Sequence, residues 1–102
     1  MLKNEKTKIA LAQIAPKLGD LKSNLKKHLD FILKAKNEKA DLVIFPELSL
    51  TGYSLKDAVY DVALRGDDEF LKPIYDVSND IAVSFGMVEL TDNFQAKNTQ
   101  LF

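Results

Sequence analysis

Two short apolar segments separated by an amphipathic stretch constrain this fold more than any other feature of the sequence. Lys8–Ala15 (KIALAQIA) is apolar on nearly both of its alternating faces, and Leu42–Phe45 (LVIF) is continuously apolar. Such runs are typical of strands buried on both sides. The stretch between them carries a helical stripe of apolar residues: Leu21, Leu25, Leu29, Ile32 and Ala35. The pattern therefore predicts a right-handed βαβ unit with parallel strands.

Local punctuation marks where these elements begin and end. Pro16 is expected to end the first strand, because proline lacks the backbone N–H that a strand donates. Gly19 is the expected positive-φ residue of the following turn, and Asp20 is the expected N-cap of the helix.

The second half of the chain predicts two further helices and two further strands. Ser54–Val62 begins with a possible capping box and carries a short helical stripe, and Asp68–Ser78 carries another in which Pro73 delays or kinks the helix. Ile81–Val88 and Ala96–Phe102 are the remaining expected strands, joined by a turn at Glu89–Asn93. The predicted order β-α-β-α-α-β-β belongs to the α/β class.

Composition excludes several classes of function. The chain has 102 residues, 14 Lys plus Arg and 15 Asp plus Glu, so no charge excess favours nucleic acid or an anionic membrane as partner. Its apolar runs are too short to cross a bilayer. We expect a polar tail at residues 1–7, one domain at residues 8–102, and a cytoplasmic location.

The sequence offers no basis for a metal site or a bound cofactor. It contains no cysteine and one histidine, His28. His28 stands among Lys26, Lys27 and Asp30 with no second ligand nearby, so we expect it on the helix surface.

Glu47 is the strongest candidate for chemistry. It follows the second predicted strand, and ligands of open α/β sheets collect at the carboxyl ends of strands. Apolar neighbours would bury its carboxylate, raise the pKa and make it a proton acceptor near neutral pH. A carboxylate that simply turns into solvent at the strand end is the structural alternative.

Around Glu47 the sequence resembles a known family. FPELSLTGY, preceded by ADLVI and by AQIAPKLGDLKSN and followed by SFGMVE, is similar to the amino-terminal part of the nitrilase, or carbon–nitrogen hydrolase, superfamily. The resemblance runs from Lys8 to Phe102. The wording ELSLTGYSLKD is especially similar to the glutaminase domain of glutamine-dependent NAD synthetases.

The resemblance implies an αββα sandwich that hydrolyses non-peptide carbon–nitrogen bonds through a thioester. The family uses a glutamate general base, a lysine that stabilises the tetrahedral intermediate, and a cysteine nucleophile. Glu47 falls on the glutamate position. Tyr53 falls on a tyrosine that helps to form the substrate pocket, so an amide or nitrile is the expected small-molecule substrate.

The chain departs from the family pattern because it lacks two of the three catalytic residues. It has no cysteine, and Lys97 is not at the position of the family's lysine. Ser49 is no convincing replacement nucleophile, because no base is placed to activate it. We therefore expect an amino-terminal fragment of a hydrolase that is inactive alone.

Two other functions compete with a hydrolase fragment. A non-catalytic α/β fragment could use its open sheet edge to bind a partner, and the sparse helical cover predicts self-association or a complementary chain. A receiver-like signalling domain fits less well, because Pro46 or Glu47 occupies the phosphoacceptor position and the first strand lacks an acidic pair for magnesium.

Overall fold

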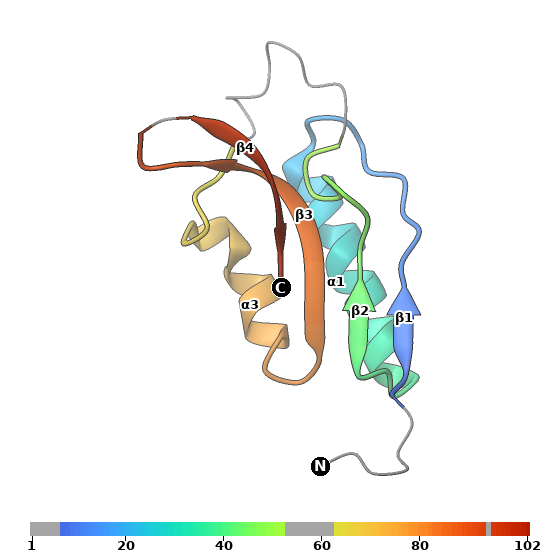
Figure 1. The fold of residues 1–102 in the computed structure, drawn as a ribbon. Coiled ribbons are helices and arrows are strands. Elements are labelled where there is room, and N and C mark those ends of the chain that lie inside the picture. The colour runs from blue at the N-terminus through green and yellow to red at the C-terminus, as the bar shows by residue number, and fades with distance from the viewer. Residues whose placement is uncertain (1–6, 53–62, 94) are drawn as a thin grey trace.

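The computed structural model describes residues 7–52, 63–93 and 95–102, which build one four-stranded sheet in the order β1-β2-β3-β4 (Figure 1). The strands are β1 (Ile9–Leu11), β2 (Leu42–Ile44), β3 (Ala82–Leu90) and β4 (Ala96–Leu101). β2 pairs in parallel with β1 and with β3, whereas β3 and β4 pair antiparallel. The predicted parallel βαβ unit and the α/β class are confirmed.

Helix α1 (Leu21–Asn37) connects the first two strands, and its start is the one predicted. Gly19 has φ +71° and delivers the chain to the helix. Asp20 is the N-cap, and its carboxylate accepts a hydrogen bond of 3.0 Å from the Ser23 backbone N–H. This bond satisfies one of the amide groups that a helix start leaves without a partner.

The second helical region begins late, as Pro73 indicates. A short 3₁₀ turn, η2 (Glu69–Leu71), precedes helix α3 (Lys72–Val77), and Pro73 lies in the first turn of α3. Proline is tolerated there because the first helical N–H groups have no intrahelical acceptor. The other predicted helix, Ser54–Val62, lies outside the described residues. No helix in the described part of the chain is long and apolar enough to span a membrane.

The helices cover one face of the sheet, and in Figure 1 both lie behind the strands. The core between the layers contains Ile32 of α1 and Ile74 of α3 packed with Val43 and Phe85. On the opposite face Ile9 is 51% exposed and Leu11 is 73% exposed. The prediction that the first strand is buried on both sides is wrong, because the described helices cover only one side of it.

The β3–β4 hairpin is longer than predicted. Glu89 and Leu90, expected in the turn, continue β3 and pair with Lys97 and Ala96. Because successive side chains of a strand point to opposite faces, Lys97 shares the helix-covered face with its partner Glu89, and Asn98 lies on the uncovered face. Leu48 and Ala96, which pack against Val88, belong to the uncovered face as well.

Candidate active site

The candidate catalytic carboxylate lies in a turn just beyond the carboxyl end of β2. Glu47 opens this turn, which runs over residues 47–51, and its side chain is exposed. Its Oε1 accepts a hydrogen bond of 2.7 Å from Nδ2 of Asn98 on β4. The apolar environment expected for Glu47 is wrong, because the turn directs the carboxylate to the uncovered face and toward the polar side chains of β4.

The turn lies directly on Gly86 of β3. The Leu50 N–H donates a hydrogen bond of 2.9 Å to the Gly86 carbonyl. A Cβ atom at position 86 would stand 2.3 Å from the Leu48 nitrogen and 3.0 Å from the Glu47 carbonyl carbon, closer than side chains tolerate. Leu48 itself has φ +52°, in the left-handed region that non-glycine residues rarely occupy. The backbone beside Glu47 is therefore both strained and closely packed.

Beneath the turn lies a buried serine–histidine pair. The Ser49 and His28 side chains are both fully buried. Ser49 Oγ lies 2.8 Å from His28 Nε2, and the imidazole stacks on Phe45 at 4.3 Å between ring centroids. The prediction of a surface His28 is wrong, because its neighbouring charges in the sequence lie on the outer side of α1. Ser49 likewise has the base that the sequence reasoning did not find.

The pair has the contacts of a nucleophile and its base, but it has no exposure to a substrate. Burial lowers the pKa of His28 from its ordinary value, and the hydrogen bond to the Asn24 backbone carbonyl opposes that shift. The imidazole is therefore neutral at physiological pH. A serine this deep in the core cannot attack a bound substrate, so the pair connects structure rather than performing hydrolysis.

Asn24 ties the start of α1 to the same turn. Its Nδ2 donates to the carbonyls of Lys17 (2.8 Å) and Leu50 (2.9 Å), and its Oδ1 accepts from the Lys17 N–H at 2.6 Å. Asn24 is fully buried. Its side chain satisfies loop groups that regular secondary structure leaves without a partner, which explains an asparagine inside a helix core.

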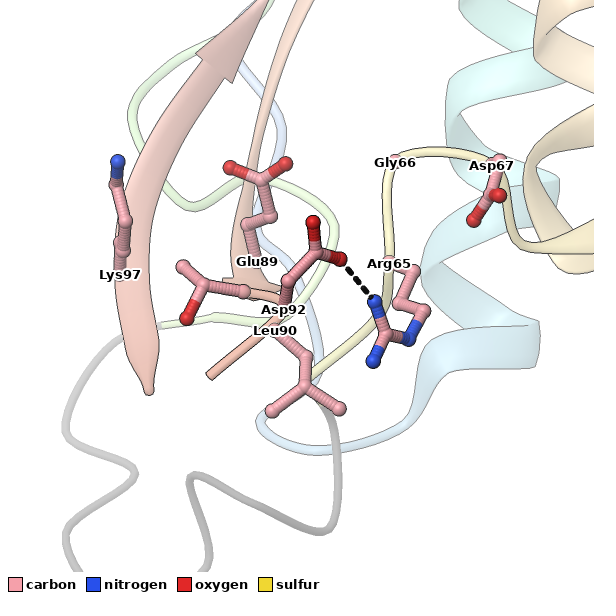
Figure 2. Close-up of a pocket in the computed structure, with 8 residues that line it drawn as sticks. Arg65, Gly66, Asp67, Glu89, Leu90, Asp92 and Lys97 are labelled. Atoms are coloured by element: carbon pink, nitrogen blue, oxygen red, sulfur yellow. Dashed lines mark hydrogen bonds and ion pairs between the residues drawn. The ribbon is translucent and has the colours of Figure 1, made fainter. Parts of the chain in front are cut away.

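A polar cavity of about 370 Å³ opens on the helix-covered face of the hairpin (Figure 2). Asp92 forms an ion pair of 2.6 Å with Arg65 at its wall. Burial, together with the charges of Glu89 and Asp67, raises the pKa of the neighbouring Tyr75. The cavity is lined by Arg65, Gly66, Asp67, Glu89, Leu90, Thr91, Asp92 and Lys97. It therefore lies across the hairpin from Glu47.

The other predicted site residue and the missed one differ in how they could be found. Tyr53 lies outside the described residues. Asn98, the partner of Glu47, was missed because it is 51 residues away in sequence. The alternation of Ala96–Leu101, which places Asn98 and Gln100 on one polar face, is the only signal that points to it.

Comparison with known proteins identifies the family. The carbon-nitrogen hydrolase family profile matches residues 8–102. The glutamine-dependent NAD(+) synthetase of Acinetobacter baylyi is 36% identical over 93 residues, which are 90% of this chain and 17% of the relative. The chain thus spans about a sixth of the length of that relative.

Solved structures agree with this assignment. A glutamine-dependent NAD+ synthetase from Acinetobacter baumannii, in complex with ADP, superimposes with a TM-score of 0.74 at 35% identity, over 92% of this chain and 18% of that one. An amidase from Nesterenkonia sp. shares the fold with a TM-score of 0.77 at 24% identity, over 92% of this chain and 36% of that one. The chain belongs to the carbon–nitrogen hydrolase family of the nitrilase superfamily.

Proposed function

We propose that this chain supplies the general base, Glu47, of a carbon–nitrogen hydrolase that acts on small amides or nitriles. The observation that carries the proposal is the position of Glu47: an accessible carboxylate at the carboxyl end of a central parallel strand, oriented by Asn98. Its backbone is strained at the adjacent Leu48, and such strain is concentrated at functional sites. Membership of the family supports the same role.

The chemistry requires residues from outside this chain. In the proposed reaction Glu47 takes a proton from a cysteine thiol, the thiolate attacks the substrate carbon, and the proton passes to the leaving nitrogen. Water then hydrolyses the thioester. None of the 102 residues is a cysteine. Lys97 points to the opposite face of β4 from Asn98, which argues against a role for it as the oxyanion lysine.

The substrate class follows from the relatives. We propose an amide substrate of the glutaminase type, because relatives that are 30–36% identical are named glutamine-dependent NAD(+) synthetases. Tyr53 is the proposed pocket residue on the basis of the TGY motif. The isolated chain is expected to be inactive, since it holds only the base.

A chimera tests this function. The matching segment of the Acinetobacter baylyi relative is replaced by this chain, and ammonia release from glutamine is measured. The chimera should be active, and Glu47→Gln should abolish activity, because the amide keeps the shape of the side chain but accepts no proton. Glu69→Gln, an exposed carboxylate in η2, is the matched control. Normal turnover by the Glu47→Gln chimera removes Glu47 from the mechanism.

A partner that completes the domain is part of the proposal. The exposed Ile9 and Leu11 lie on the face that the described helices leave uncovered. Exposed apolar side chains on a sheet face favour association. We propose that a second copy or a complementary chain covers this face; the alternative of a purely non-catalytic binding fragment uses the same surface.

A further inference from the structure

We propose that Ser49 and His28 are positioning residues: their buried hydrogen bonds hold the strained turn on β3 and so place Glu47 beside Asn98. The inference rests on the proposed role of Glu47 for its catalytic meaning. The mechanical part concerns only the contacts inside this chain. It adds a residue of α1, 19 positions before Glu47, to the machinery of the site.

The direction of these hydrogen bonds is set by the backbone groups at their two ends. His28 Nδ1 lies 2.6 Å from the Asn24 carbonyl oxygen, which can only accept, so Nδ1 carries the proton. Nε2 is then an acceptor, and the Ser49 hydroxyl donates to it over 2.8 Å. At the other end the Gly86 N–H donates to Ser49 Oγ over 3.2 Å. Every polar group of the pair is satisfied in this one arrangement.

The arrangement connects three elements through the turn. His28 belongs to α1, Gly86 belongs to β3, and Ser49 lies between them in the turn that Glu47 opens. Leu48 separates Glu47 from Ser49 and adopts the left-handed conformation. A strained residue persists only when its neighbours hold it from both sides. Asn98 holds the Glu47 side, and the buried pair holds the Ser49 side.

Two buried polar side chains are a poor choice for stability alone. An apolar pair would fill the space between α1 and the turn without the cost of removing two polar groups from water. What the serine–histidine pair adds is direction, since only one rotamer of Ser49 meets both Gly86 and His28.

The test follows the Glu47–Asn98 contact directly. In the full chain, NMR records hydrogen exchange of the Asn98 side-chain amide, whose Nδ2 donates to Glu47. Ser49→Ala should speed that exchange about tenfold, because the turn loses its buried anchor. Ser78→Ala, an exposed serine whose Oγ donates to the Tyr75 carbonyl, should leave it unchanged.

Two variants of His28 separate positioning from general stability. Leucine fills the space without an acceptor, so His28→Leu should speed Asn98 exchange as Ser49→Ala does. Glutamine keeps a neutral acceptor within reach of Ser49, so His28→Gln should restore most of the protection. Unchanged Asn98 exchange in both Ser49→Ala and His28→Leu overturns the inference.

Wild-type chain provides a measurement that needs no variant to fold. A protonated Nε2 cannot accept from Ser49, so the Asn98 amide resonance should shift with the midpoint of the His28 ring ¹⁵N titration. No charged side chain contributes to the shift of the His28 pKa. The Glu47 carboxyl is followed separately by ¹³C to remove its own effect on Asn98. An Asn98 resonance indifferent to His28 protonation also overturns the inference.

Activity of the chimera distinguishes the two proposals. If Ser49→Ala frees Asn98 while turnover stays normal, the positioning inference stands and the catalytic role of Glu47 is wrong. If Glu47→Gln abolishes turnover while Ser49→Ala changes neither Asn98 exchange nor kcat, the proposed function stands and the positioning inference is wrong.

Discussion

Asn98 donates a hydrogen bond of 2.7 Å to Glu47 across 51 residues of sequence and from a different strand. The contact joins the carboxyl end of the parallel part of the sheet to the antiparallel hairpin. It orients one carboxylate oxygen and leaves the other open, as a proton acceptor requires. A mixed sheet therefore provides both the position and the orientation of the proposed base.

Removing this contact should affect turnover more than stability. Asn98→Ala in the active chimera is expected to lower kcat roughly tenfold with KM unchanged, because the carboxylate is no longer held toward the reacting atoms. Lys97→Ala, next to it on the other face of β4, should leave kcat unchanged. Steady-state kinetics checks this, and equal effects of the two substitutions would contradict it.

Gly86 should tolerate no side chain. Gly86→Ala brings a Cβ atom within 2.3 Å of the Leu48 nitrogen, so the turn must move, at a cost of about 1–3 kcal/mol or more in unfolding free energy. Gly66→Ala is the matched control: its Cβ would meet only Glu89 Oε2, at 3.5 Å. Urea unfolding of both variants measures the difference. A Gly86→Ala chain as stable as the wild type would show that the turn is not closely packed.

Stability should fall on acidification because of His28. Burial lowers the folded-state pKa of His28 below its ordinary value of 6.5. Below that value the unfolded chain takes up a proton while the folded chain stays neutral, so the unfolding free energy decreases as pH falls. Above it both states are neutral and the contribution is complete. The decline ends below the folded-state pKa, where both states are protonated.

Urea unfolding from about pH 7.5 down to about pH 5.5 measures this decline across the range in which histidine titrates. His28→Gln, which cannot take up a proton, should show a flatter profile over the same range. Parallel profiles for the wild type and His28→Gln would mean that other groups cause the acid sensitivity.

The uncovered face should mediate association. Leu11→Lys should shift the chain toward monomer in sedimentation at low micromolar concentration, because Leu11 is 73% exposed on that face. Leu33→Lys is the control, since Leu33 is 58% exposed on α1, away from the sheet. A strictly monomeric wild-type chain, or an equal effect of the two lysines, would count against this surface.

Local patterns in the sequence were sufficient for the framework of the fold. The apolar runs and the helical stripe between them predicted parallel β1 and β2 joined by α1, and Gly19 with Asp20 marked the start of that helix. These features depend on residues within a few positions of one another, and elementary backbone and capping preferences decide them. The FPELSLTGY motif likewise identified the family and Glu47 as its candidate base.

Tertiary structure alone decided how the candidate site is held. The same stripe of α1 has Asn24 and His28 at its buried centre, and hydrophobic patterning cannot indicate polar residues whose partners come from elsewhere. Ser49 lies 21 residues from His28, and Asn98 lies 51 residues from Glu47. Sequence determined the elements because their causes are local; only folding determined which polar groups meet, because a buried hydrogen bond needs a partner that another element brings to it.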